Sequence, residues 1–513
     1  MVTAPPEPVA ASPPYRYPGR RVYSVVGVPP EIQAYALAKY SRSEQGMLES
    51  IQELSQQRAE QFLNTFYFQY GHRSIADLAH LVFGLEQISI LAAIAVVDEP
   101  VWDGQERSTR YQPFRRTGWH LPAEVAGTRH EPTFTRTAEA LLGAYHDLAQ
   151  ALLEHLQDAV ARPPELDQGA YRRTLRARAF DVARALLPLA THTSVGQIVS
   201  ARVLERQIGR LLESPYREVR AVGEDLKQAC QGPAHAPLLA EPQPAAAPTL
   251  VKYAAASAYR QQVERDLAEA AAAWLRVAGQ ADRSVGVDLV DAMADPLDEI
   301  VATLLYRHDR AGHSYRQAQM VVAGLSQAHK RELFDLSVRG RGSHDDLLRE
   351  HQAGYGLVFD VLVDIGSFRD LHRHRRCIQL QQPLSFDAGF RPPDEVFISG
   401  LGARAGLAAL EAGLGDTYAE ALTKGEQTAA EVRATSAEAA DYLLPLAYQT
   451  RCLFKMDWAQ AAYMIEQRTQ PQGHFSYRRV AWAMFEALRR RWPDLAAAIR
   501  AVDPGQSVDL LRR

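Results

Sequence analysis

The sequence predicts an α+β protein in which one fold is present twice along the chain. Its 513 residues exceed the length at which a single hydrophobic core stops growing, so two or more domains are expected. Apolar residues recur with the helical period at 218–229 and 480–491, whereas 83–90 and 355–365 are short strand-like runs. Helices and strands do not alternate strictly, which favours α+β over a succession of βαβ units.

A repeated segment indicates the duplication. Residues 186–190 and 443–447 both read LLPLA, and a threonine follows each at the same offset. Earlier in each half, at 31–32 and 299–300, a glutamate and an isoleucine open an apolar helical pattern. Because the order of these segments is shared, duplication with insertions is the simpler account.

Two stretches rich in Pro and Ala divide the chain. Residues 1–20 are predicted to be a disordered tail, and 231–248 are predicted to be an extended linker. The first copy then occupies 21–230 and the second copy 249–513. The second copy begins with an extra Ala-rich helix within 260–280, which we interpret as a packing or inter-copy helix without chemistry.

The composition is that of an ordinary soluble globular protein. Hydrophobic residues make up 47%, charged residues 23%, and the formal net charge is -4, which gives no sign of nucleic-acid or membrane binding. The longest apolar run, 88–97, is about half of the roughly 20 residues that span a bilayer. The N-terminus lacks the basic start and apolar stretch of a secretory signal, so a cytoplasmic protein is expected.

The three cysteines, Cys230, Cys377 and Cys452, are far apart in the sequence. Their spacing fits neither a disulfide framework nor a zinc site. We expect reduced, mostly buried thiols and no metal centre.

A run of cations in the second half is the first candidate site. Arg373, His374, Arg375 and Arg376 follow an apolar run directly. Guanidinium groups match phosphate oxygens bidentately. A solvated basic turn is the alternative, but cations at the end of a buried element favour a ligand or an acidic partner.

A second candidate lies in the first half, where Glu106, Ser108, Arg110 and Tyr111 form the pattern ExSxRY. In extended chain, side chains two residues apart project to the same face, and a hydroxyl with an arginine suits one phosphate group. A polar edge strand is the alternative.

Two single arginines complete the candidates. Arg184 precedes the first LLPLA segment, and the second half has Asp441 in that place. Arg468 in the second half has its closest first-half analogue in Arg210, one position out of register. Lone arginines near helix ends are often solvated or cap carbonyls, so each is informative only together with the other motifs.

Taken together, these motifs resemble the flavin-dependent thymidylate synthases. That family has a GHxSxxEH stretch, an RHR motif seven residues before SxRY, an ARxxLPxxxxT segment, and an NAR segment followed by a late arginine. The upstream stretch matches at 71–78, where His72 is kept and Asp77 and Leu78 replace Glu and His. Loose similarity covers nearly all of each half. The remaining matches in the first half are Glu106, Ser108, Arg110 and Tyr111, Arg184 to Pro188 with Thr193, and Ser200, Ala201 and Arg202.

The two halves depart from the family in complementary ways. The first half has Asp98, Glu99 and Pro100 where RHR is expected, and the second half has Pro383 and Ser385 at the SxR positions.

The same holds for the two single arginines. The second half lacks the ARxxLP arginine, and the first half has Leu211 in place of the late arginine. In the family, one subunit of a homotetramer supplies ExSxR and ARxxLP, and its neighbour supplies RHR and the late arginine. The resemblance therefore implies two copies of the family's fold, a mixed sheet with flanking helices, which share one composite site.

The resemblance also implies the chemistry. The family methylates dUMP to dTMP with methylenetetrahydrofolate as carbon donor and NAD(P)H as reductant, through FAD, and without a covalent enzyme nucleophile. Glu106, Ser108, Arg110, Arg184 and Arg468 would bind the nucleotide, and Arg373, His374, Arg375 and His72 would bind the flavin. A homodimer that mimics the family's tetramer is expected.

Two alternatives stay open at this point. The family's glutamine three residues before RHR, which reads the pyrimidine, is Asp370 here, so a flavoenzyme acting on another pyrimidine nucleotide is the second hypothesis. The third is a non-catalytic flavin- or nucleotide-binding protein, because the GHxSxxEH and NAR segments are eroded.

Overall fold

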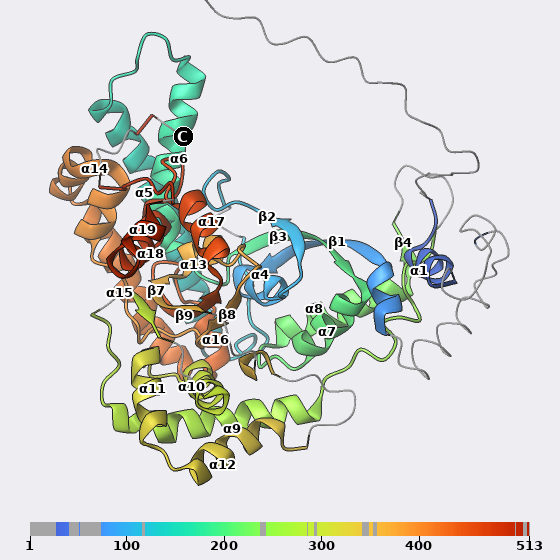
Figure 1. Ribbon diagram of the computed structural model, residues 1–513. Helices are drawn as coiled ribbons and strands as arrows, with labels where there is room; N and C mark the ends of the chain where they lie inside the picture. Colours follow the sequence, from blue (N-terminus) through green and yellow to red (C-terminus); the bar gives the residue numbers. More distant parts are fainter. Residues whose placement is uncertain are drawn as a thin grey trace, which may run out of the picture.

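A computed structural model (Figure 1) shows small antiparallel sheets set among helices, and the described residues form three of them, with three, two and four strands. The structure describes residues 27–39, 51, 73–114, 118–235, 243–284, 286–291, 295–340, 348–351, 356–497, 499–505 and 510–511. The predicted tail at 1–20 and His72 therefore lie outside the described residues.

The first half contains helices on both sides of its strands in the sequence. They are α1 (Pro30–Lys39), η2 (Arg73–Leu78), β1 (His80–Ser89), α4 (Ile90–Val97), β2 (Asp103–Glu106), α5 (Glu131–Ala159), α6 (Gln168–Ala183), η3 (Arg184–Leu186), β3 (His192–Ser200), α7 (Ala201–Leu212), α8 (Arg217–Gln231), β4 (Pro233–Ala234) and β5 (Gln243–Ala245).

The second half has a larger set of elements. They are α9 (Ala258–Leu275), η4 (Arg276–Ala278), β6 (Val287–Val290), α10 (Pro296–His308), α11 (Tyr315–Gly324), α12 (Gln327–Val338), η5 (Arg349–His351), β7 (Leu357–Asp364), α13 (Ile365–Leu371), β8 (Ile378–Gln381), α14 (Pro393–Glu411), α15 (Leu414–Arg433), α16 (Ala437–Asp441), β9 (Gln449–Met456), α17 (Trp458–Arg468), α18 (Phe475–Arg491) and α19 (Pro493–Ala496).

The three-stranded sheet of the first half and the four-stranded sheet of the second half share a strand order. The first is β1-β3-β2 and the second β6-β7-β9-β8, with every pairing antiparallel. Strands β7, β9 and β8 thus repeat β1, β3 and β2, and β6 is an additional edge strand. The α+β class and the duplication predicted from the sequence are both confirmed.

In each copy, two strands lead directly into helices through a capping side chain. Ser89 ends β1 and caps α4, and Asp364 ends β7 and caps α13. Ser200, the last residue of β3, caps α7, and Asp457, which directly follows β9, caps α17. Because these caps bond backbone N–H groups of the first helical turn, each helix begins at a fixed distance from its strand.

The repeated LLPLA segments lie against each other between the copies. The backbone N–H of Leu189 donates to the carbonyl of Leu444 at 2.9 Å, and that of Leu446 donates to Leu187 at 3.0 Å. Pro188 and Pro445 form the bridge between them. These bonds are reciprocal, as in a twofold interface, so the motif that revealed the duplication also joins its two copies.

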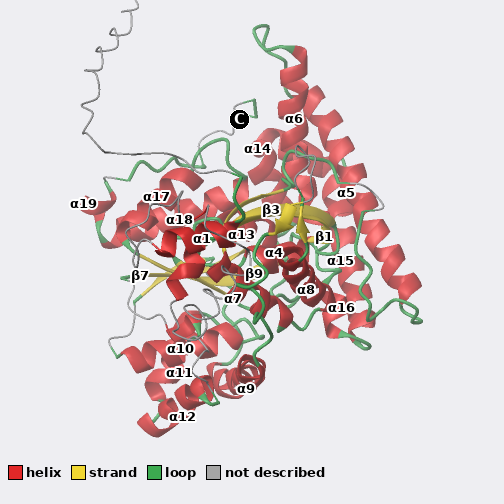
Figure 2. Ribbon diagram, turned by 90° about the vertical axis from the view of Figure 1, so that its right-hand side faces the viewer, coloured by secondary structure: helices red, strands yellow, loops and turns green. Residues whose placement is uncertain are grey.

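One hydrophobic core crosses the boundary between the halves. It contains residues of α4 to α8 together with residues of α14, α15 and α16, and α15 packs along α5 (Figure 2). Inside this interface the hydroxyl groups of Thr137 and Thr428 are 3.0 Å apart. The halves are therefore packed as one body around a shared core.

The Ala-rich stretch forms α9 and η4, and α9 packs against α10 and α12 (Figure 1). Its buried side chains include Val263, Leu267 and Ala271. The helix therefore packs mainly within the second half, and Arg260 in its first turn also pairs with Glu213 of the first half at 2.9 Å.

The central Pro/Ala-rich stretch differs from an extended spacer. Strands β4 and β5 pair antiparallel within it, and the N–H of Ala247 donates to the carbonyl of Cys230. Ala247, Leu250 and Val251 then pack into the shared core. The chain folds back here because these apolar side chains are buried in the core to which α8 contributes.

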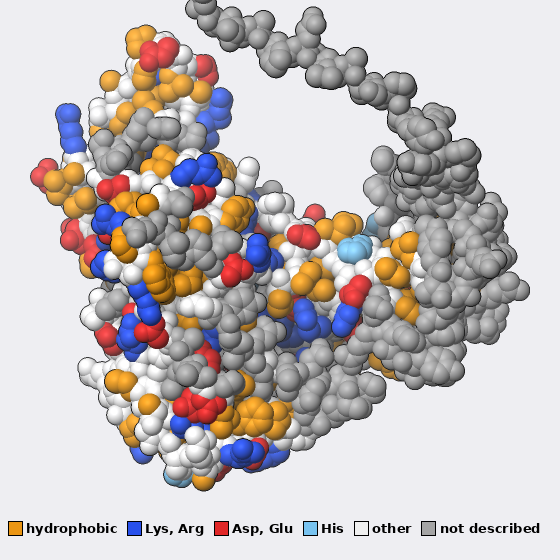
Figure 3. All heavy atoms as spheres, viewed as in Figure 1, with side chains coloured by type: hydrophobic (Ala, Val, Ile, Leu, Met, Phe, Trp, Pro, Cys, Tyr) orange, Lys and Arg blue, Asp and Glu red, His pale blue; other side chains and the backbone are white. Residues whose placement is uncertain are grey.

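Charged side chains of both signs are interspersed on the face shown in Figure 3. Among the described residues, no helix is long and apolar enough to cross a membrane. The apolar run at 88–97 forms the end of β1 and the buried helix α4.

Candidate functional site

The ExSxRY segment ends a strand and forms a turn. Strand β2 stops at Glu106, and the hydroxyl of Ser108 accepts from the backbone N–H of Arg110 at 3.2 Å. The N–H of Gln112 donates to the carbonyl of Ser108 at 3.2 Å. The expected extended conformation is therefore wrong from Ser108 onwards, because this local side-chain bond favours a turn.

Arg110 is buried and makes contacts in both halves. It donates to the two carboxylate oxygens of Asp181 at 2.8 and 3.1 Å. It also donates to the hydroxyl of Tyr477 and to the carbonyl of Gln472, both at 3.1 Å. A guanidinium that is 8% exposed is thus neutralised by its own half and oriented by the other.

Arg184 is the second buried arginine and begins η3. Its Nη1 donates to the hydroxyl of Thr109, and Nη1 and Nη2 both donate to Oδ2 of Asp370, all at 3.2 Å. Asp370 belongs to α13 of the second half. Burial favours the neutral acid, but Arg184 and Arg110 hold the pKa of Asp370 below its usual value.

The second-half cations follow α13 and have unequal environments. Arg373 is exposed. His374 is buried and accepts from Nε of Arg468 at 2.7 Å. Burial, together with Arg468, lowers the pKa of His374 to about 3, so this imidazole is neutral at physiological pH.

Arg375 lies against the first half. It donates to the carbonyl of Trp102 at 3.0 Å, and its guanidinium stacks over the Trp102 ring at 4.6 Å. Burial lowers the pKa of Arg375 to about 10, and Arg373 contributes in the same direction. The group stays cationic at neutral pH and would be stabilised further by an anion.

Two more contacts connect the halves. Arg369 forms a buried ion pair with Glu106. The ring of Tyr477 lies beneath the guanidinium groups of both Arg110 and Arg468, at 5.7 and 5.4 Å. We call Glu106, Arg110, Arg184, Asp370, Tyr477, His374 and Arg468 the composite cluster.

Four residues outside the predicted site orient its side chains. Asp181, Thr109, Arg369 and Tyr477 each bond or stack with a predicted site residue. Asp181 precedes Arg184 by one helical turn, but its carboxylate accepts from Arg110, so this spacing did not indicate the contact. The other contacts depend on how the chain folds.

A small, partly open pocket lies beside this cluster, next to Arg184. Its lining combines polar groups of both halves, including Arg184, Asp364 and His474, with the apolar side chains Val396 and Phe475. Polar groups at an otherwise apolar wall are typical of small-molecule sites.

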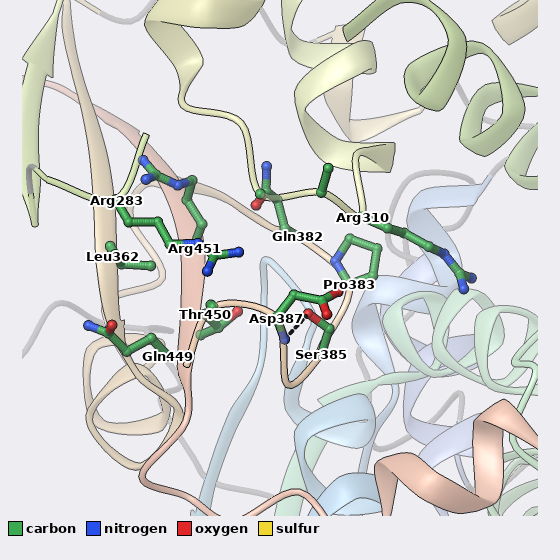
Figure 4. Close-up of a pocket in the computed structure, with 13 residues that line it drawn as sticks. Arg283, Arg310, Leu362, Gln382, Pro383, Ser385, Asp387, Gln449, Thr450 and Arg451 are labelled. Carbon is green, nitrogen blue, oxygen red and sulfur yellow. Dashed lines mark hydrogen bonds between the residues drawn. The ribbon is translucent and has the colours of Figure 1, made fainter. Parts of the chain in front are cut away.

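The second-half residues at the positions of ExSxRY and of the ARxxLP arginine are different in type, and we call them, with the first-half residues at the positions of RHR, the counterpart positions. Pro383 and Ser385 replace the serine and arginine of ExSxRY and line a small pocket with Asp387 (Figure 4). The backbone N–H of Asp387 donates to the hydroxyl of Ser385 at 3.2 Å. Arg310 extends away from the other labelled side chains (Figure 4).

The acids that stand in place of RHR have structural partners. Asp98 pairs with Arg349 at 2.9 Å. Glu99 pairs with Arg206 and Arg210 at 2.8 and 2.9 Å. These carboxylates are therefore held in ion pairs across and within the halves.

Asp441, which stands in place of Arg184, accepts from the hydroxyl of Tyr216 at 2.9 Å. Burial raises the pKa of Asp441 to about 6, although Tyr216 and Arg433 act in the opposite direction. In the described part of the chain, no group of His, Cys, Asp and Glu residues is arranged to hold a metal ion.

Comparisons with known proteins add to this geometry. A family model described as "Thymidylate synthase complementing protein", Thy1, matches residues 27–234 and again 288–494. A UPF0159 protein of Chlamydia muridarum is 26% identical over 94% of this chain and 92% of its own length. One of Thermoplasma acidophilum is also 26% identical, over 91% of this chain and 95% of its own. A flavin-dependent thymidylate synthase of Clostridium tetani is 24% identical over 34% of this chain and 67% of its own.

Proposed function

The chain belongs to the Thy1 family of thymidylate synthase complementing proteins, with the family domain present twice, and from this premise we propose that it is a flavin-dependent methyltransferase. The proposed reaction is the methylation of dUMP to dTMP at the composite cluster, with methylenetetrahydrofolate as carbon donor and NAD(P)H as reductant.

One observation carries the proposal. Within one chain, side chains of the first-half motifs contact side chains of the second-half motifs. Arg110 bonds Tyr477, whose ring also lies beneath Arg468, and Arg184 bonds Asp370. This arrangement supports a single site built from ExSxRY and ARxxLP of the first copy and from RHR and the late arginine of the second.

The residues present fit a flavin with a diphosphate. Arg373 is exposed, and within the described ranges no carboxylate pairs with it or with Arg375. Asp98, Asp103 and Glu99 lie close enough to raise the pKa of Arg375, but two neighbouring cations outside direct ion pairs still suit a diphosphate. Arg373, His374 and Arg375 would hold the flavin, which supplies the electron transfer when bound. The proposed role of His72 remains an expectation, because that residue is outside the described part.

The chain's own residues would bind and orient the substrates. Ser108, Arg110 and Arg184 would hold the nucleotide phosphate, Arg468 would lie at the pyrimidine, and Glu106 is fixed by Arg369. Pre-formed contacts of this kind lower the entropic cost of bringing reactants together.

The cysteines support catalysis without a protein nucleophile. Burial raises the pKa of Cys230 and of Cys377 to about 12, and it raises the pKa of Cys452 as well. Thiols with such pKa values carry almost no thiolate at neutral pH.

The test measures tritium release or methyl transfer with dUMP, UMP and dCMP side by side, after flavin absorbance has been recorded. Turnover of dUMP by yellow protein is the expected result. Yellow protein that turns over only another pyrimidine nucleotide would support the second candidate, which the Asp370–Arg184 pair favours. Protein that binds neither flavin nor nucleotide would contradict both, and binding without turnover would favour the non-catalytic reading.

The proposed assembly is a homodimer. One chain contains two copies, whereas the family's sites lie within a tetramer of single copies, so two chains supply the same number. Light scattering should give twice the chain mass. A stable monomer, or a tetramer of full chains, would contradict this.

A further inference from the structure

We infer that Asp370 determines specificity by competing with a ligand's phosphate for Arg184. This inference rests on the proposed function, because it places the anionic end of a pyrimidine ligand at the composite cluster. Its starting point is the ion pair itself. Both terminal nitrogens of Arg184 bond the same carboxylate oxygen of Asp370 at 3.2 Å, and only 3% of the Arg184 side chain is exposed.

The cluster has no unneutralised arginine in its buried part. Arg110 is bound by both oxygens of Asp181, and Arg184 is bound by Asp370. An incoming phosphate that binds at Arg184 displaces the Asp370 carboxylate or shares Arg184 with it. Sharing places two anions around one buried guanidinium, where their repulsion is weakly screened. Asp370 thus weakens the binding of a phosphate at this point.

Asp370 is ionised when a ligand arrives. Its pKa lies below the ordinary value because of Arg184 and Arg110. Only Oδ2 accepts from Arg184, and 20% of the side chain is exposed. Among the described residues no donor bonds Oδ1. A carboxylate accepts hydrogen bonds and donates none, so Oδ1 suits a hydroxyl or amino group and repels a phosphate oxygen.

The chemical class follows from these contacts. A pyrimidine nucleoside, whose free hydroxyl can donate to Oδ1, should bind the wild-type protein within about tenfold of its 5′-monophosphate. Replacing the carboxylate with an amide removes the negative charge and keeps the shape, and it should restore a preference for the monophosphate of at least tenfold. Tenfold corresponds to about 1.4 kcal/mol.

The experiment uses inorganic phosphate as its first probe, because this ion requires neither a base nor a flavin. Calorimetric titration of the full chain compares wild type, Asp370→Asn and Asp370→Gln. Both neutral variants should bind phosphate about 10- to 100-fold more tightly than wild type. Asp370→Glu keeps the charge and should not gain affinity. Asp441→Asn is the matched control at the counterpart position, and its affinity for phosphate should equal that of wild type. Thermal unfolding shows which variants are folded.

The second probe is the pair of deoxyuridine and dUMP, titrated into the same proteins. The ratio of the two affinities should shift toward dUMP only in the neutral Asp370 variants. Unchanged phosphate affinity in the folded neutral variants, or a wild-type preference for dUMP far above tenfold, would overturn the inference. A gain in phosphate affinity without binding of either pyrimidine would leave the competition standing and contradict the proposed function.

Discussion

The composite cluster and its counterpart positions are related by the duplication, and they differ mainly in charge. At the first, Arg184 meets Asp370 of the other half, and the pKa of the Asp370 carboxyl is lowered. At the second, Asp441 replaces that arginine and meets Tyr216, and burial raises the pKa of the Asp441 carboxyl to about 6. The same fold thus places an arginine paired with a carboxylate at this position in one direction, and a carboxyl group bonded to a phenol in the other.

The difference shows how a duplicated site can be lost without loss of the fold. Asp98 and Glu99, which stand where RHR is expected, are held by Arg349, Arg206 and Arg210. A buried carboxylate would be costly without such partners. The counterpart positions have therefore acquired a structural role, and this comparison leads to the following predictions.

The largest expected effect is on the flavin. Arg375→Ala should yield colourless protein, because it removes a half-buried cation that, among the described residues, no carboxylate holds in a direct ion pair. Asp98→Ala should stay yellow, since an acid at this position repels a diphosphate. Absorbance of the purified proteins, with Asp98→Asn as a variant that keeps the hydrogen bonds to Arg349, checks both. Equal loss of colour in both would remove the asymmetry between the two positions.

The next effect is on nucleotide affinity. Arg110→Ala and Arg468→Ala should each weaken dUMP binding by about tenfold to a hundredfold, roughly 1.5 to 3 kcal/mol for a charge-assisted contact. Because both guanidinium groups contact the Tyr477 ring, the double variant should lose less than the sum. Arg210→Ala, which alters the pair with Glu99, should bind dUMP as wild type does. Strictly additive losses would indicate separate sites.

A smaller effect separates the two acids by pH. The folded-state pKa of Asp441 is about 6, above the unfolded value of about 3.9. Stability should therefore fall as the pH rises from about 4 to 6 and remain lower above that range. Asp441→Asn should remove this dependence and raise the free energy of unfolding at pH 8 by about 1 to 3 kcal/mol.

Asp370 should behave in the opposite way. Its pKa is lowered in the folded protein, so its ion pair stabilises the fold above the unfolded pKa and is lost as the pH falls below it. Asp370→Asn should therefore reduce stability at pH 8. Denaturant unfolding at pH 4, 6 and 8 measures both variants. The same sign for both would contradict the electrostatic difference.

The last change is expected to leave the number of nucleotide sites per chain unaltered. Pro383→Ser combined with Ser385→Arg restores the motif letters in the second half. It should not create a second site, because Asp98 and Glu99 still stand where cations are needed. Nucleotide titration should saturate at one per chain before and after the change. A stoichiometry of two would show that the motif letters alone are sufficient.

The sequence by itself determined the fold class, the duplication and the chemical types at the site. Helical period, strand-like runs and the repeated LLPLA segment are local patterns, and each depends on neighbours along the chain. The complementary losses at 98–100, Pro383 and Ser385 were also readable, because they required only letters and spacing. The turn at Ser108 was predicted wrongly, because one side-chain bond to the backbone decided between two local conformations.

Only the tertiary structure decided which charges meet. Arg184 and Asp370 are separated by 186 positions in the sequence, and their pairing follows from reciprocal bonds between the two LLPLA segments and from the shared core. The opposite pKa shifts of Asp370 and Asp441 have the same origin. Desolvation and neighbouring charge depend on what packs around a group in space, and residue type and spacing do not specify that.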